Sequence, residues 1–227
     1  MHVPHLHDWN ISPGEAIALQ NTLAKQLIND RPLDLDAIKL VAGVDVSVKP
    51  DAAGVPQSQA AIAVLSFPAL EVVETALAHM PTPFPYIPGL LSFREGPVLE
   101  AAFARLQSDP DVYIFDGMGR AHPRRIGIAA HMGLWLNKPT IGCGKTLLIG
   151  HHKEPAIERG GYTDLIDRDE VIGVALRTRD KVKPVYISPG HLCDLPSAIA
   201  LTMRCVTRYR LPEPIRAAHH AAGEFDV

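Results

Sequence analysis

The chain has 227 residues, 47% hydrophobic and 21% charged, which excludes a disordered or collagen-like protein and predicts one domain over residues 1–227, its core spanning about 12–220. No apolar run approaches the roughly 18 residues of a membrane span, and the N-terminus lacks signal-peptide features, so we expect a cytoplasmic protein without a membrane partner. Three cysteines without a C-x-x-C pair exclude a disulfide framework and a cysteine zinc site.

The net charge of −3 hides an uneven distribution. Residues 1–116 carry 6 Lys and Arg against 14 Asp and Glu, whereas residues 117–227 carry 16 against 11. This pattern suits an anionic partner held by the second half and a cation bound by carboxylates of the first half. A random scatter of charge over solvated faces is the alternative.

The first predicted element is an amphipathic helix on the periphery. Ser12 suits the N-cap, Pro13 the first helical position, and Glu15 the closing position of a capping box. Apolar residues then recur until Asn29 and Asp30, where we expect the helix to end.

Three strands are predicted next, at residues 39–48, 59–67 and 70–80, because these runs are β-branched or alternate in polarity. A loop at 50–56 and Pro68 separate them. Consecutive strands with short connections favour an antiparallel meander.

Helices and strands alternate in the rest of the chain, after a proline-rich loop at 81–89. We therefore expect an α/β fold with a mixed central sheet, in which three antiparallel strands are followed by parallel strands and helices flank the sheet. The predicted strands are 111–116, 138–144, 170–178 and 183–188, and the predicted helices are about 97–107, 124–136 and 195–209.

Two carboxylates interrupt apolar strands. Asp45 lies in the middle of one strand, where an unpaired carboxylate is costly to desolvate. Asp116 follows another at its carboxyl end, where open α/β sheets bind ligands. Each alone can be paired with Arg or can cap a turn, but two on neighbouring strands favour a shared cation.

Glu95 has two interpretations. Ser92 and Glu95 have capping-box spacing, but Pro97 would then be the fifth helical residue, where its ring is penalised. A helix starting near Gly96 would place Pro97 at its favoured first position and leave Glu95 free to reach a metal.

The loop at 81–89 contains four prolines and two aromatic residues, Phe84 and Tyr86. An aromatic residue on a stiff loop can act as a wedge against stacked bases, and a buried lid is the alternative.

Gly144-Lys145-Thr146 resembles the end of a phosphate-binding loop, but Pro139 stands where its first glycine is required. Lys145 remains suited as a point charge near a phosphate. Basic residues after Asp116 suit contacts with phosphates: Arg120, His122, Arg124, Arg125 and His131.

Together these motifs resemble the endonuclease V family of deoxyinosine 3′ endonucleases. They follow the family's order and cover most of residues 12–220. The motifs are VAGVDVSV (41–48), PYIPGLLSFREGP (85–97), FDGMGRAHPRRIGIAAHMGL (115–134), PTIGCGKTLL (139–148), SPGH (188–191) and LPEPIRAAHH (211–220).

The resemblance implies an RNase H-like fold that binds Mg²⁺, or Mn²⁺ in its place, through Asp45, Asp116 and Glu95. It implies catalytic roles for Lys145 and for His219, with His220 as the alternative at the fourth position. It also places the wedge at Tyr86, and His122 and His131 near the cleaved backbone. A base flipped into a pocket would then be approached closely by the backbone at Gly89, Gly117 and Gly127, with Tyr86 and Pro88 filling the gap.

The expected activity is hydrolysis of DNA at the second phosphodiester bond 3′ to deoxyinosine, leaving 3′-OH and 5′-phosphate ends. We expect a monomer that acts in DNA repair on deoxyinosine or other deaminated bases. One alternative is an inosine-specific endoribonuclease, since the sequence does not fix the sugar preference. The other is a noncatalytic nucleic-acid-binding module, which would not need buried carboxylates.

Overall fold

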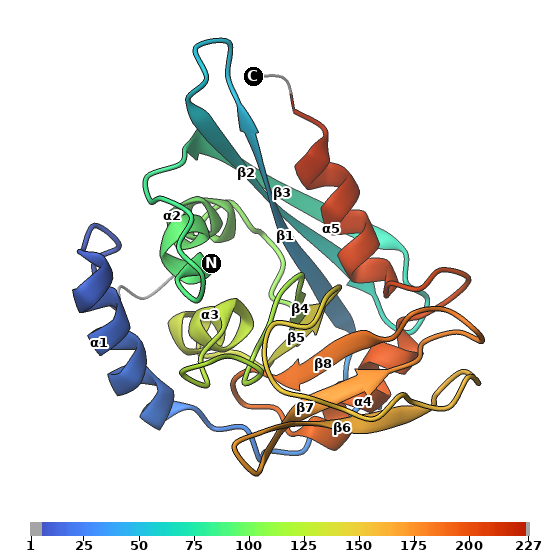
Figure 1. Cartoon of the computed structure of the whole chain (residues 1–227). Helices are drawn as coiled ribbons and strands as arrows, with labels where there is room; N and C mark the ends of the chain where they lie inside the picture. Colours follow the sequence, from blue (N-terminus) through green and yellow to red (C-terminus); the bar gives the residue numbers. More distant parts are fainter. Residues whose placement is uncertain (1–5, 226–227) are drawn as a thin grey trace.

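The computed structural model describes residues 6–225 (Figure 1). Its strands form one eight-stranded sheet in the order β3-β2-β1-β4-β5-β8-β7-β6. The strands are β1 (Leu40–Pro50), β2 (Pro56–Ser66), β3 (Val72–Pro81), β4 (Val112–Phe115), β5 (Thr140–Gly144), β6 (Tyr162–Asp167), β7 (Glu170–Leu176) and β8 (Val185–Pro189).

Strand pairing confirms the mixed sheet. β1, β2 and β3 form the expected antiparallel meander. β4 pairs in parallel with both β1 and β5. The sheet then continues with antiparallel pairing through β8, β7 and β6, so its parallel part is confined to β1, β4 and β5. Strand β6 was not predicted.

The helices are α1 (Pro13–Leu23), α2 (Leu91–Phe103), α3 (Ile128–Leu136), α4 (Leu195–Arg204) and α5 (Glu213–Gly223), with a 3-10 turn η1 (Ala24–Gln26). The predicted capping box at Ser12 is confirmed. α1 ends earlier than expected, because the chain becomes extended at Leu27 and the Ile28 N–H donates to His191. α3 starts later than expected, since Arg125 has a left-handed φ of 62° that a helix excludes.

Helices cover both faces of the sheet (Figure 1). α2 and α3 share one core with Ala42 and Val44 of β1, whereas α4 and the start of α5 share another with Val41. Successive β1 residues therefore alternate between the two cores, as a strand requires. No helix in the described part of the chain is long and apolar enough to cross a membrane.

Gly43 determines how closely α5 approaches β1. A Cβ atom at this position would lie only 1.8 Å from the carbonyl oxygen of Pro214, at the start of α5. Because side chains alternate along a strand, Gly43 and Asp45 project from the same face of β1, which is the face that α5 covers. The close approach thus places α5 beside Asp45.

Candidate active site

The parallel pairing of β1 with β4 brings Asp45 and Asp116 together. Val44 is the partner of Phe115, and the Asp116 N–H donates to the Val44 carbonyl at 2.9 Å, one residue beyond β4. One oxygen of Asp45 accepts from the N–H of Val46 at 2.9 Å, which fixes the carboxylate against its own strand. The sheet therefore juxtaposes the two predicted carboxylates.

Two other predicted residues complete this cluster. His219 on α5 lies with its Nδ1 atom 2.6 Å from Oδ2 of Asp45. Lys145 follows β5, and its ammonium forms an ion pair with Asp116 and lies 3.4 Å from His219 Nδ1. His220 points elsewhere, toward Glu224 at 3.1 Å, so His219 is the member of the pair that reaches the carboxylates.

The cluster suits a divalent cation. Ligand atoms of Asp45, Asp116 and His219 all lie within 4.8 Å of one another. Burial raises the pKa of Asp45, and the negative charge of Asp116 raises it further, whereas the hydrogen bond with His219 lowers it. Carboxylate oxygens that repel each other in a partly buried position are the ligands Mg²⁺ and Mn²⁺ prefer, and a cation there would relieve the repulsion.

Glu95 occupies the second turn of α2, which corrects both sequence interpretations of this residue. α2 begins at Leu91 and contains Pro97 in its interior, so Glu95 does not project from a loop before the helix. Within the described chain no side chain caps the start of α2, which excludes the capping box with Ser92.

The Glu95 carboxyl interacts electrostatically with the cluster, although its helix α2 packs on the face of the sheet opposite to α5. Burial raises its pKa well above the ordinary value, and Asp45 and then Asp116 raise it further. Among the described residues, the group whose ligand atoms lie within 4.8 Å of one another does not include Glu95. Glu95 is therefore near enough to interact with the charges of both aspartates, but it is outside the group of the three closest candidate ligands.

A pocket of about 310 Å³ adjoins the cluster. Its walls come from the segment 86–92, the turn after β4, the start of α3 and the segment after β5. Tyr86 is 70% exposed at this pocket, whereas Phe84 is buried against Phe93 and Leu90. The two aromatic residues of the proline-rich loop thus differ, and only Phe84 has the position expected of a lid. The predicted residues that line the pocket are Tyr86, Pro88, Gly89, Asp116, Gly117, His122, Gly127 and Lys145.

Three side chains hold the pocket wall at Gly89. Its carbonyl accepts from Gln20 at 3.1 Å and from Arg124 at 2.6 Å, and the His122 Nε2 atom lies 3.0 Å away. Gly89 has a φ of +80°, which favours glycine, and a Cβ atom there would lie 2.8 Å from the Arg124 guanidinium. Arg124 and His122 therefore position the loop, a role that the basic pattern in the sequence did not indicate.

His131 lies in the core. It is completely buried, its Nε2 atom is 2.7 Å from Nε2 of His7, and its ring contacts Trp9 and Phe93. Burial lowers its pKa to about 3, and so, to a smaller extent, does His7. This position contradicts the prediction that His131 contacts a nucleic-acid backbone. The periodic apolar neighbours of His131 in α3 are the sequence signal for a buried histidine.

Two further arginines have structural partners. Arg125 forms an ion pair with Asp167 at 2.8 Å and with Glu170 at 2.7 Å, so its charge is already neutralised. Arg210, which the motif analysis missed, donates to the carbonyl of Lys145 at 2.8 Å and to that of Pro184 at 2.7 Å. Arg210 thereby ties the segment carrying Lys145 to the chain that leads into α5.

Comparison with known proteins agrees with this geometry. The family model of endonuclease V matches residues 11–220. The endonuclease V of Nostoc sp. is 50% identical over 223 residues, covering 98% of this chain and 99% of its relative. The crystal structure of the Bacillus subtilis endonuclease V has a TM-score of 0.94 at 35% identity and covers 98% of this chain and 96% of that one.

A further solved structure contains nucleic acid. Endonuclease V of Ciona intestinalis, in complex with a 24mer DNA containing an inosine followed by a ribo-adenosine, has a TM-score of 0.80 at 27% identity. The alignment covers 93% of this chain and 96% of that one. The chain therefore belongs to the endonuclease V family and has the expected RNase H-like fold.

Proposed function

We propose that this endonuclease recognises deoxyinosine in DNA and hydrolyses the second phosphodiester bond on its 3′ side, leaving 3′-OH and 5′-phosphate ends. The observation that carries the proposal is that Asp116 lines a pocket large enough for a base and lies beside a second carboxylate, Asp45. The Ciona relative, which binds inosine-containing DNA, supports the choice of substrate.

Asp45, Asp116 and His219 would hold Mg²⁺ or Mn²⁺, with Glu95 as a further carboxylate of the site. When bound, the metal would supply charge stabilisation at the phosphate and would make a bound water more acidic than bulk water. The Lys145 ammonium, which pairs with Asp116, is placed to add positive charge as the phosphate becomes more negative. The imidazole of His219 orients the Asp45 carboxylate through its hydrogen bond.

The pocket beside Asp116 would receive the flipped base. Hypoxanthine has a carbonyl where adenine has an amino group, so backbone N–H donors in the wall would favour it over adenine. Gly89, fixed by its three donors, gives this wall a defined shape before the substrate binds. Tyr86 lies exposed at the same pocket, where it can fill the space that the flipped base leaves in the stack.

Matched oligonucleotides would test the proposal. DNA strands with one deoxyinosine or deoxyadenosine, and RNA strands of the same sequence with one inosine or adenosine, are incubated with Mg²⁺, with Mn²⁺ or with EDTA. The product ends are then mapped. We expect cleavage at the second phosphodiester bond on the 3′ side of deoxyinosine when Mg²⁺ or Mn²⁺ is present, and no cleavage in EDTA. Preferred cleavage of the RNA strand would instead identify an endoribonuclease, and binding without cleavage would identify a noncatalytic module.

A further inference from the structure

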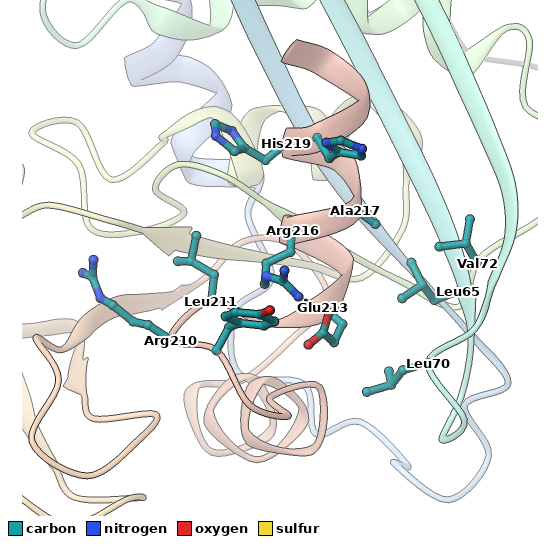
Figure 2. A pocket seen from close by; sticks show the side chains of 11 residues that line it. Leu65, Leu70, Val72, Arg210, Leu211, Glu213, Arg216, Ala217 and His219 are labelled. Carbon is teal, nitrogen blue, oxygen red and sulfur yellow. Dashed lines mark hydrogen bonds and ion pairs between the residues drawn. The ribbon is translucent and has the colours of Figure 1, made fainter. Parts of the chain in front are cut away.

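A second groove, of about 710 Å³, begins where the active site ends (Figure 2). One side is the outer face of α5, from Glu213 to His220, and the other is the connection between β2 and β3 around Leu70. His219 lines the groove and also belongs to the metal-ligand cluster, so the two sites adjoin at this residue. We call it the α5 groove.

The α5 groove contains a preformed stacking surface. The guanidinium carbon of Arg216 lies 3.5 Å from the centroid of the Tyr209 ring, over its face. An ion pair with Glu213 at 2.7 Å holds Arg216 in place. Tyr209 is 40% exposed. Aromatic and guanidinium planes of this kind bind the bases of single strands without sequence preference.

The remaining walls also suit a nucleic-acid strand. Leu70 and Val72 supply apolar surface, and Val72 is 55% exposed. Arg210, also in the lining, donates to the uncharged carbonyls of Lys145 and Pro184 and so keeps a positive charge for a phosphate. Arg216 is paired with Glu213, and His220 lies 3.1 Å from Glu224. The carboxylate of Glu213, an acidic residue of the lining, forms the ion pair with Arg216 and accepts a hydrogen bond from the hydroxyl of Thr207. Apolar surface for bases beside cationic groups for phosphates matches the chemistry of a single strand.

The positions of the two sites indicate which part of the strand the α5 groove would bind. The base pocket is lined by Asp116 and the α5 groove by His219, so the carboxylate cluster lies between them. If the flipped base occupies the pocket and the cut is made on its 3′ side, the strand beyond the cut must continue away from the pocket.

We propose that the α5 groove binds the strand on the 3′ side of the cleaved bond, with a base stacked on the Tyr209–Arg216 pair. This inference rests on the proposed function, because that function defines which side of the cut lies farther from the lesion. The groove would then retain the product that carries the new 5′-phosphate.

Two series of fluorescent deoxyinosine strands would test this proposal, one shortened stepwise on the 3′ side and one on the 5′ side. Dissociation constants are measured by anisotropy for the wild type, Tyr209→Ala and Arg216→Gln. We expect the affinity of the wild type to increase as the 3′ arm lengthens. In each variant the increase should be about tenfold smaller than in the wild type. The matched control is Tyr162→Ala, which removes a tyrosine of β6 that is 52% exposed and lies outside the groove.

The proposal is wrong if both variants keep the full dependence on 3′ arm length, or if they lose affinity equally in the two series. Arg216→Gln decides the matter alone if Tyr209→Ala does not fold. Failure of the proposed function is separate, since it appears as absent cleavage of deoxyinosine strands by the wild type. The dependence of binding on arm length is still measurable in that case.

Discussion

His219 and His122 lie on two sides of the same site in opposite environments. The His219 side chain is 62% exposed and contacts a carboxylate and an ammonium group. His122 is only 4% exposed, and burial lowers its pKa to about 4, assisted by the positive charge of Arg124. One histidine belongs to a charged, accessible cluster, and the other is a neutral donor that fixes the loop at Gly89.

This difference indicates that the α5 side of the site carries out the chemistry, whereas the loop side recognises the base. On the α5 side, charged groups lie close together and a cation would compensate their repulsion. On the loop side, three hydrogen-bonded side chains hold the pocket wall in place, so little ordering is required when a base enters. Mutations on the first side should therefore change the rate of cleavage, and mutations on the second should change stability or selectivity.

The largest effect is expected at the two strand carboxylates. Asp45→Asn and Asp116→Asn should each lower cleavage by about three orders of magnitude, because each removes a metal ligand and several kcal/mol of charge stabilisation. Without metal, Asp45→Asn should unfold at a slightly higher temperature, since its raised pKa reports a disfavoured charge. Asp116→Asn should show no such gain, because it loses the ion pair with Lys145.

Single-turnover cleavage and thermal unfolding with EDTA measure both effects. Asp164→Asn, at an exposed position on β6, is the matched control. Activity within about tenfold of wild type, or about 1.4 kcal/mol of barrier, in either active-site variant would contradict the metal assignment.

Glu95→Gln tests whether the second face of the sheet takes part in the chemistry. We expect the cleavage rate to fall about 100-fold, because an amide can neither transfer protons nor bind a metal as the carboxylate does. The pKa of Glu95 is higher in the folded protein than in the unfolded chain. Its contribution to stability therefore decreases as the pH rises above the pKa of the unfolded chain. Without metal, Gln should therefore preserve or raise the melting temperature at neutral pH. Normal activity combined with lower stability would indicate a structural role.

Part of this arrangement was predictable from the sequence, and the reasons are local. Asp45 and Asp116 interrupt apolar strands, and strand neighbours follow from connection lengths. Glu95 was placed wrongly because packing of Phe93, Gly96 and Val98 in the core outweighs the cost of Pro97 inside α2.

The position of His219 was predicted only through the family resemblance. Its helix α5 was not recognised, although Ile215, Ala218 and Ala222 recur on one face and are buried. The contacts of His122 and Arg124 with Gly89 join residues 33 and 35 positions apart, and no local pattern encodes them.

A smaller effect, on stability, is expected at His122. Its pKa of about 4 lies below the ordinary value of 6.5, so between these values the unfolded chain takes up a proton that the folded protein does not. Stability must therefore fall as pH decreases, by about 3 kcal/mol between pH 8 and pH 4 from this residue alone. His122→Gln removes the titration and should flatten the pH dependence by that amount.

Urea unfolding across this pH range measures the effect of His122→Gln. His151→Gln, at an exposed histidine, is the matched control variant. His131 contributes in the same direction, because burial also lowers its pKa, so some acid sensitivity should persist in His122→Gln. An unaltered slope in His122→Gln would mean that folding does not lower the pKa of this residue.

The mildest change is expected at Tyr86, which tests whether the loop recognises the lesion. Tyr86 is 70% exposed, and Gly89 is held by other side chains, so Tyr86→Ala should leave the melting temperature and the pocket wall unchanged. If Tyr86 stacks where the flipped base was, the variant should lose about 1 to 3 kcal/mol of binding to deoxyinosine DNA and little on undamaged DNA.

Tyr86→Phe keeps the ring and should retain the selectivity, which separates stacking from any role of the hydroxyl. Binding to the two DNAs at one salt concentration gives the selectivity ratio, because phosphate contacts weaken equally on both as salt rises. Equal weakening of both DNAs by Tyr86→Ala would assign the residue to general strand binding. A lower melting temperature would assign it to the loop structure, and recognition would then depend on the Gly89 wall alone.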